Sequence, residues 1–379
     1  MNENLAITHL FKHSQTSPTT DVKIPGKLFI SGEYAILFPQ QPAILIAVDQ
    51  YLHARITSSP NLSTGEIQSN LAELGKLSFT LSQEGFVFSP ERSSGWTYVI
   101  HAMIVVSELF KALNIPLKAF NLSFHSDLVH DNGVKLGLGS SGAVVVGTIK
   151  SLLDYNGLAA VDNSVIFKLA AIALTRLQSK GSLGDIATIT HGGWVYYQAF
   201  DRQWLNTLIQ QGVSVAELLL LDWPDLIIEN LEVSSDLSLL IGWTQAAAST
   251  ENLVSKLLSQ ITDNDAFLAN FLLESKVAVN RLREALVANQ IDQVQLAIQN
   301  YRRLLQALEQ HYHLNIETNK LSQLILTANN LGFASKSSGA GGGDCGIAIA
   351  SNNHPIQQLE DKWQQLDIVT LDLNPTTQF

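Results

Sequence analysis

The sequence predicts an α+β fold of two domains, and three of its features support this prediction. Strand-like and helix-like segments occur in clusters, without the regular alternation that is typical of a doubly wound sheet. The chain has 379 residues, of which 46% are hydrophobic, which is enough for two domains with a large core. Near residues 215–235 the strand-rich sequence gives way to long amphipathic helices. We therefore expect an irregular N-terminal segment over 1–20, a first domain over 21–225 and a second over 226–379.

The first domain should contain most of the strands. Short apolar or alternating segments predict strands at 27–31, 43–48, 52–57, 119–126 and 194–198, with a hairpin at 76–89. Apolar residues three and four positions apart predict helices at 96–113 and 165–177, and a further helix that begins near residue 142.

The second domain should be mainly helical. After a strand at 237–243, helical periodicity extends over 249–262, 264–289, 291–312 and 318–331. A unit of strand, glycine loop and strand at 333–350, a helix at 355–366 and a last strand at 367–373 complete the pattern.

The composition argues against several classes of protein. Lys and Arg number 23 against 34 Asp and Glu, and the net charge of −11 disfavours a nucleic acid or an anionic membrane as a partner. Because Cys345 is the single cysteine, no disulfide can form within the chain. Residues 1–20 are polar and no apolar run approaches the roughly 18 residues of a membrane span, so we expect a cytoplasmic protein.

The most informative segment is Lys135-Leu-Gly-Leu-Gly-Ser-Ser-Gly142, between a predicted strand and a predicted helix. Glycines at such a junction let backbone N–H groups approach an anion, and a helix N-terminus favours negative charge. These properties suit the phosphates of a nucleotide. A flexible connection with a serine helix cap would use the same residue types. The segment is not a P-loop, because the GxxxxGK[ST] pattern is absent.

Three other segments combine glycines with charged or hydroxyl side chains. The segment 335–346 has four glycines within five positions, a density that costs chain entropy and favours a second anion-facing loop over a simple turn. Lys27 and Glu33 lie in the segment 23–37, where each alone would be a surface lysine and a turn carboxylate. Asp185 ends the turn 181–185, where a helix cap and a functional carboxylate are equally compatible with it.

Together, and in this order, the four segments resemble the GHMP kinase superfamily, which includes galactokinase, homoserine kinase and mevalonate kinase. The family pattern is a PGK…GE opening, a GLGSS phosphate loop, an aspartate in a Ser/Gly-rich turn and a late glycine-rich loop, and it spans about residues 22–350 here. Some phrases are similar to the phosphomevalonate kinase branch, in its compact bacterial form: Gly32-Glu-Tyr-Ala-Ile-Leu37, Gly242-Trp-Thr244 and Lys336-Ser-Ser-Gly-Ala-Gly-Gly-Gly-Asp-Cys-Gly346.

This resemblance implies an N-terminal domain like domain 2 of ribosomal protein S5, a ferredoxin-like C-terminal domain and an active site between them. The implied reaction transfers a phosphoryl group from ATP to (R)-5-phosphomevalonate in the mevalonate pathway of isoprenoid biosynthesis, with Mg²⁺ as cofactor. Mevalonate kinase, diphosphomevalonate decarboxylase and a non-catalytic nucleotide-sensing protein of the same fold are the alternatives. A monomer and a homodimer both remain open.

The resemblance also implies roles for particular residues. Lys27, Lys135 and Asp185 are the expected catalytic residues. The phosphates of ATP would be held by Gly137, Leu138, Gly139, Ser140, Ser141 and Gly142, with Ser141 as a ligand of Mg²⁺. The acceptor would be bound by Lys27, Tyr34, Lys135, Ser182, Ser338, Gly339, Ala340 and Gly341.

The role of Asp185 needs a separate argument. In relatives that phosphorylate an alcohol, the equivalent aspartate is usually regarded as a general base. A phosphate acceptor has a second pKa of about 6 and is largely ionised at neutral pH, so it hardly needs one. We therefore expect Asp185 to orient Lys27 or to bind Mg²⁺. Mevalonate kinases also carry a Mg²⁺-binding glutamate on the preceding helix, whereas the stretch 174–179 contains no carboxylate.

Two weaker hypotheses complete the set. Arg202 is either a further contact of the acceptor phosphate or a plain surface residue. Trp96, with Ser93 and Ser94, is either near the adenine or, for the tryptophan, part of the core.

Overall fold

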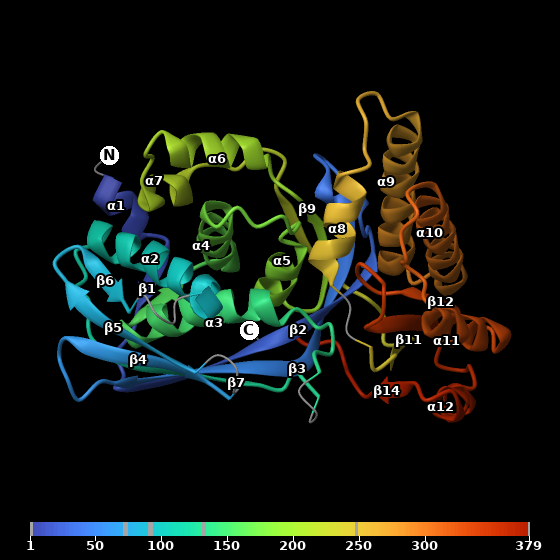
Figure 1. Cartoon of the computed structure of the whole chain (residues 1–379), viewed down its shortest axis with the longest axis horizontal. Helices are drawn as coiled ribbons and strands as arrows, with labels where there is room; N and C mark the ends of the chain where they lie inside the picture. Colours follow the sequence, from blue (N-terminus) through green and yellow to red (C-terminus); the bar gives the residue numbers. More distant parts are fainter. Residues whose placement is uncertain (1–2, 71–74, 90–93, 131–133, 247–248, 378–379) are drawn as a thin grey trace.

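The computed structural model describes residues 3–70, 75–89, 94–130, 134–246 and 249–377. It contains an eight-stranded sheet, a four-stranded sheet and a separate pair of strands, with helices packed on both larger sheets. In Figure 1 the eight-stranded sheet and its helices form one side of the molecule, and the C-terminal helices with the four-stranded sheet form the other. The prediction of an α+β fold is confirmed.

The large sheet is organised around one long strand, β3 (Pro42–Ser58). β2 (Thr19–Ser31) pairs along one edge of β3. On the other edge, β9 (Trp194–Gln198) pairs with residues 42–46 and β7 (Phe120–Ser126) with residues 52–58. The two strands predicted at 43–48 and 52–57 are therefore one strand that changes partner. The remaining strands of this sheet are β4 (Thr64–Ser69), β5 (Lys76–Ser82), β6 (Gly85–Phe88) and β10 (Ile227–Leu231).

Helices cover one face of this sheet (Figure 1). α3 (Ser140–Tyr155) and α5 (Gly184–His191) pack on β2 and β3, and α2 (Thr97–Ala112) and α4 (Asn163–Arg176) pack on those helices. α6 (Arg202–Gln210) and α7 (Val215–Leu220) contact α4. The alternation expected of such a sheet is present, because Phe120, Leu122 and Phe124 of β7 are buried while His125 is exposed.

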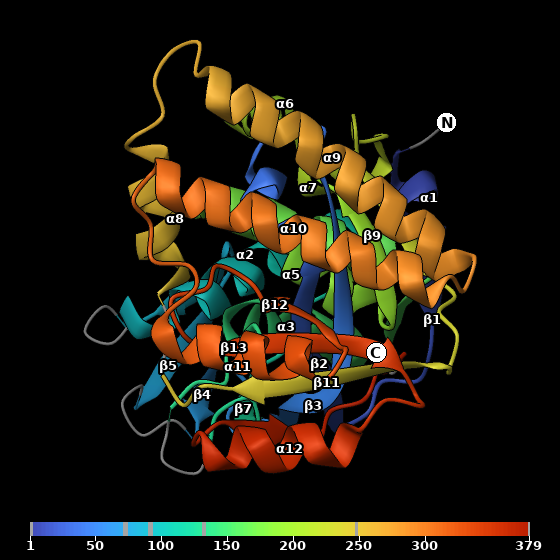
Figure 2. The same cartoon turned by 90° about the vertical axis from the view of Figure 1, so that its right-hand side faces the viewer.

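The C-terminal part is a second layered unit (Figure 2). Its sheet has the order β12-β13-β11-β14, and α10 and α11 pack on β12, while α9 lies beside α10. The strands are β11 (Leu237–Trp243), β12 (Ala334–Ser337), β13 (Cys345–Ser351) and β14 (Val369–Leu371). The helices are α8 (Thr250–Leu258), α9 (Ala266–Val287), α10 (Ile291–His311), α11 (Asn319–Asn330) and α12 (Ile356–Gln365). Across the described ranges, none of the helices has the length and apolar character that a bilayer crossing requires.

The N-terminal segment is more ordered than the sequence predicts. In place of an irregular stretch over 1–20, α1 (Glu3–Thr8) is followed by β1 (Phe11–His13), which pairs with β8 (Leu158–Ala160). The physical reason is burial, since Ile7 and Phe11 lie in the core at 1% and 5% exposure. The apolar residues of this segment are divided between a helix of 6 residues and a strand of 3, which are too short to produce a recognisable periodic pattern.

The change from one sheet to the other comes slightly later than predicted. β10 pairs with β9 of the large sheet, and β11 is the first strand of the small one. A boundary at 225/226 would therefore separate β10 from its own sheet. The end of the chain returns to the large sheet, where Pro375 pairs with Val48.

One buried ion pair joins the two parts of the molecule. Glu33, which follows β2, contacts the ammonium group of Lys336 on β12, and the two side chains are 2% and 0% exposed. The backbone N–H of Gly339 donates to the same carboxylate at 3.3 Å, and the hydroxyl of Tyr301 on α10 donates to the carbonyl of Glu33 at 2.9 Å. The sequence motif around Glu33 and the late glycine-rich loop are therefore held together by charge and hydrogen bonds.

Removal of one partner of the Glu33–Lys336 pair should greatly lower the free energy of unfolding. Lys336→Met leaves the carboxylate of Glu33 buried without a counter-charge, and such a loss typically costs about 3–5 kcal/mol of folding free energy. The double variant Glu33→Gln/Lys336→Met removes both charges and should recover much of that loss. Urea unfolding followed by tryptophan fluorescence measures both effects. A single variant as stable as the unmodified protein would contradict a structural role for the pair.

Candidate functional site

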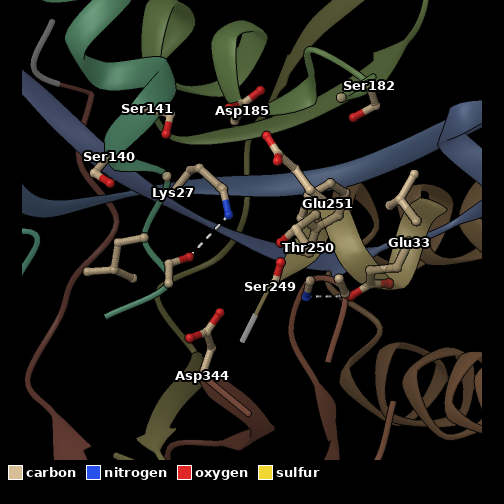
Figure 3. A pocket seen from close by; sticks show the side chains of 18 of the residues that line it. Lys27, Glu33, Ser140, Ser141, Ser182, Asp185, Ser249, Thr250, Glu251 and Asp344 are labelled. Carbon is tan, nitrogen blue, oxygen red and sulfur yellow. Dashed lines mark hydrogen bonds between the residues drawn. The ribbon is translucent and has the colours of Figure 1, made fainter. Parts of the chain in front are cut away.

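A cavity of about 570 Å³ lies between the two parts of the molecule, and the four segments singled out from the sequence meet in it (Figure 3). β2 contributes Lys27 and the glycine-serine loop contributes residues 137–141. The turn before α5 contributes Ser182, and the first turn of α5 contributes Asp185. The late glycine-rich loop adds Gly339, Ala340 and Asp344. The expected convergence of these segments is thus a property of the structure.

The glycine-serine loop presents the N-terminus of α3 to this cavity. Gly137 and Gly139 have φ of +78° and +86°, a backbone conformation that favours glycine. Gly139 is the residue that caps α3, so Ser140 and Ser141 lie in the first turn of the helix instead of serving as its cap. The first backbone N–H groups of a 16-residue helix and two hydroxyls therefore face the cavity, an arrangement that suits phosphate oxygens.

Lys27 lies along this loop. The pairing of β2 with β3 shifts register between Pro25 and Gly26, which is the kind of irregularity that re-aims a side chain next to a site. The backbone N–H of Lys27 donates to the carbonyl of Leu138 at 2.9 Å, and its ammonium group donates to the carbonyl of Gly137 at 3.3 Å. Lys135, at the start of the loop, is exposed and lines the same cavity. The site thus offers two positive charges to an anion, one oriented by the loop and one exposed.

Asp185 lies in the first turn of α5, opposite the N-terminus of α3. Leu183 is the residue that caps α5, so Asp185 does not serve as the cap. Burial raises the pKa of Asp185, while the charge of Lys27 and the backbone N–H groups of Ile186 and Asp185 act in the opposite direction. A Cβ on Gly142 would stand 2.7 Å from the carboxylate oxygen, so glycine is needed there for this close approach.

The segment just before Asp185 is fixed by hydrogen bonds from two side chains outside the cavity. The guanidinium of Arg202 donates to the carbonyls of Gly181 and Ser179 at 2.5 and 2.6 Å, and the hydroxyl of Tyr197 donates to the carbonyl of Ser182 at 2.9 Å. Arg202 does not line the cavity, so the hypothesis that it contacts an acceptor phosphate is wrong. Its donors are used instead to fix the path of the turn.

The late glycine-rich loop lines the cavity with only part of its predicted residues. Gly339 and Ala340 face it, and the carbonyl of Ala340 accepts a 2.6 Å hydrogen bond from the hydroxyl of Tyr34. The hydroxyl of Ser338 is bonded to both backbone groups of Phe29, and Ser338 does not line the cavity. A Cβ on Gly341 would lie 2.3 Å from the carbonyl oxygen of Ile316. The structure therefore assigns Ser338 and Gly341 to packing, which corrects their prediction as substrate contacts.

The adenine hypothesis finds no support in the structure. Trp96 is 2% exposed and its ring lies 6.3 Å from that of Phe124, so it belongs to the core. Ser94 does not line the cavity, and Ser93 lies outside the described residues.

Several lining residues were not identified from the sequence. The polar ones include Tyr98 on α2, Ser249, Thr250 and Glu251 at the start of α8, and Asp344. A serine followed by a glutamate predicts the start of a helix, which is correct for α8, but no sequence signal places that helix over the cavity.

A metal ion at this site would need donor atoms from a bound substrate as well as from the protein. In the ranges that the structure describes, no three His, Cys, Asp or Glu side chains are grouped as a metal site. The available donors are oxygens, namely the hydroxyl of Ser141 and carboxylates such as Asp185. This donor set fits Mg²⁺, which usually combines one or two carboxylates with substrate phosphates and water.

The position of Gly139 can be tested with a matched control. Gly139→Ala places a Cβ 3.0 Å from the side chain of Lys27, and Gly212→Ala has a similar positive φ of +78° with nothing within 4 Å. Both should lose about 1–2 kcal/mol of stability through backbone strain. Only Gly139→Ala should also weaken ATP binding, by about tenfold or more, in isothermal titration calorimetry. Equal ATP affinity in the two variants would contradict the role given to Gly139.

The raised pKa of Asp185 predicts a pH-dependent effect on stability. A carboxyl group whose pKa is raised on folding stabilises the folded state below its unfolded pKa of about 3.9, and this contribution is lost as the pH rises through the raised pKa. Without ligand or metal, Asp185→Asn should therefore raise the free energy of unfolding at pH 8. Near pH 4 the gain should disappear. Urea denaturation at pH 8 and at pH 4 measures this gain in the free energy of unfolding. An equal gain at both pH values would contradict a raised pKa for Asp185.

Known proteins resemble this chain over nearly its whole length. Residues 97–193 match the model for the N terminal domain of GHMP kinases, and residues 282–367 match the model for their C terminal domain. Phosphomevalonate kinase of Streptomyces sp. (strain CL190) is 34% identical, covering 93% of this chain and 96% of that protein.

Two solved structures show the same fold. A Lin0012 protein from Listeria innocua has a TM-score of 0.87 and 32% identity, covering 94% of this chain and 97% of its own. Phosphomevalonate kinase of Streptococcus pneumoniae was solved in complex with phosphomevalonate and AMPPNP. It has a TM-score of 0.82 and 30% identity, and the match covers 94% of this chain and 99% of that one. The converging motifs, the two-domain fold and the extent of these matches lead to one conclusion: the chain belongs to the GHMP kinase superfamily.

Proposed function

We propose that this protein phosphorylates (R)-5-phosphomevalonate with ATP, giving 5-diphosphomevalonate and ADP. The observation that carries the proposal is the near-complete similarity to bacterial phosphomevalonate kinases, one of which was solved with phosphomevalonate and an ATP analogue. The cavity supports it, because Lys27, Lys135 and Asp185 all line it together with the phosphate loop. A non-catalytic relative would be expected to have lost at least one of these three side chains.

Phosphoryl transfer depends on positioning and on neutralisation of charge more than on covalent participation by the protein. The N-terminus of α3 and the backbone N–H groups of residues 137–142 would hold the terminal phosphates of ATP. Lys27 is already oriented by the carbonyl of Gly137 and would neutralise the phosphoryl group in transfer. Lys135 would attract the anionic acceptor from the exposed end of the cavity.

Asp185 is better suited to cation binding than to proton abstraction in this reaction. The nucleophile would be a phosphate oxygen, which is largely ionised at neutral pH. In the described part of the chain Asp185 forms no salt bridge with Lys27, whose ammonium group is bonded to Gly137 instead. A carboxylate beside two sets of phosphates is repelled unless a cation stands between them. We therefore propose that Asp185 and the hydroxyl of Ser141 help to hold Mg²⁺, which when bound would neutralise phosphate charge.

The acceptor is the part of the proposal that needs a direct test. A coupled assay of ADP release with Mg-ATP should show turnover with phosphomevalonate, and none above background with mevalonate or diphosphomevalonate. Two lysines and a helix N-terminus face the cavity, which favours an acceptor that carries its own phosphate over mevalonate, and the similarity to phosphomevalonate kinases favours phosphomevalonate over diphosphomevalonate. Lys135→Ala should raise the KM for phosphomevalonate by about tenfold or more, since an opposite charge is lost from the site. Turnover with another acceptor would retain the family and reject the proposed substrate.

A further inference from the structure

A second cavity adjoins the first at the proposed point of transfer. It has a volume of about 600 Å³ and extends between the N-terminus of α2, the end of α4 and α8. The two cavities share a border made by Ser141, Asp185 and Glu251, together with Tyr98, Gly181, Thr250 and Val254. The end of the phosphate loop, the turn before α5 and the start of α8 therefore meet at one junction.

Glu251 reaches this junction from the C-terminal part of the molecule. It is the second residue of α8 and is exposed, and in Figure 3 its side chain points toward Asp185, with Ser141 and Lys27 around the same space. The position of α8 is set by packing and by a hydrogen bond just beyond its end. Val254 and Leu257 are buried, and the side chain of Gln260 donates to the carbonyl of Tyr312 at 2.9 Å. Glu251 is thus presented by a packed helix.

The charges at the junction are unbalanced. Glu33 also lines the first cavity but is paired with Lys336, whereas Glu251 has no salt bridge in the part of the chain that the structure describes. Asp185 and Glu251 act together on Tyr98, since both carboxylates add to the effect of burial in raising the pKa of that phenol. Two carboxylates that face each other across a cavity repel one another unless a cation stands between them.

α4, the helix that precedes Asp185 in the chain, has no carboxylate near its C-terminal end. The last turn of α4 and the residues after it, 173–181, contain no Asp or Glu. Mg²⁺ in phosphate-transfer sites is usually held by one or two carboxylates in addition to phosphate oxygens. Asp185 offers one, and Glu251 is the other carboxylate at the border shared by the two cavities.

We propose that Glu251 on α8 is the second carboxylate of the Mg²⁺-nucleotide site, opposite Asp185 and Ser141. The proposal rests on the proposed use of ATP, and it is independent of the identity of the acceptor. It assigns this ligand to the C-terminal part of the chain, so that the metal with its nucleotide would contact both parts of the molecule. Metal and nucleotide would then hold α8 against the N-terminus of α3.

The test measures metal binding without turnover. Glu251→Gln and unmodified protein are titrated with Mn²⁺ in the presence of saturating AMPPNP, and free Mn²⁺ is followed by electron paramagnetic resonance. The affinity of the nucleotide complex for Mn²⁺ should fall by about tenfold or more in the variant. The affinity for AMPPNP in EDTA should not fall, because a negative charge near the phosphates is removed, and retained binding also shows that the variant is folded. Glu251→Asp should recover part of the loss.

Glu274→Gln is the matched control. Glu274 is an exposed carboxylate on α9 that accepts a hydrogen bond from Asn270 and lines neither cavity, so its variant should bind Mn²⁺ normally. Unchanged Mn²⁺ affinity in Glu251→Gln would overturn the proposal, even if turnover were lost. No acceptor is present in this titration, so a wrong assignment of phosphomevalonate would leave its result intact and would appear only in the turnover assay.

Discussion

The contact between Glu33 and Lys336 is the constraint on which the site depends. Lys336 is fully buried and its ammonium group also donates to the carbonyl of Ser337 at 2.6 Å, so the start of the late glycine-rich loop is fixed together with the pair. A buried charge is tolerated only with a partner and additional hydrogen bonds, and here these come from both parts of the chain. The two halves of the cavity are therefore set against each other by a contact that neither half can satisfy alone.

The glycines of the glycine-serine loop and of the start of α3 have a second role beyond backbone freedom. A Cβ on Gly137 would lie 2.7 Å from the carboxyl carbon of Asp344, one on Gly139 would lie 3.0 Å from Lys27, and one on Gly142 would lie 2.7 Å from Asp185. Each glycine thus leaves space for one charged side chain from a different segment. The loop brings these side chains around the N-terminus of α3 because it carries no side chains of its own at these three positions.

The outcome for individual site residues follows a physical pattern. Lys27 beside the loop and Ser141 in the first turn of α3 line the cavity, because their place is set by local structure, and their catalytic and metal-binding roles stay predictions. The prediction was wrong for Ser338 and Arg202, because their donors are used by the backbone of distant segments. A sequence motif shows that polar groups are present, but the partner that satisfies each group is decided by packing.

By itself the sequence determined the α+β class, the positions of most helices and strands and the four segments that meet in the cavity, because periodicity and glycine placement are local properties. Only the tertiary structure decided that 42–58 is one strand with two partners, that residues 3–13 are ordered, and that α8 brings Glu251 to the junction of two cavities. These features depend on contacts between residues far apart in the chain. Burial and charge compensation across such distances leave no periodic trace in the sequence.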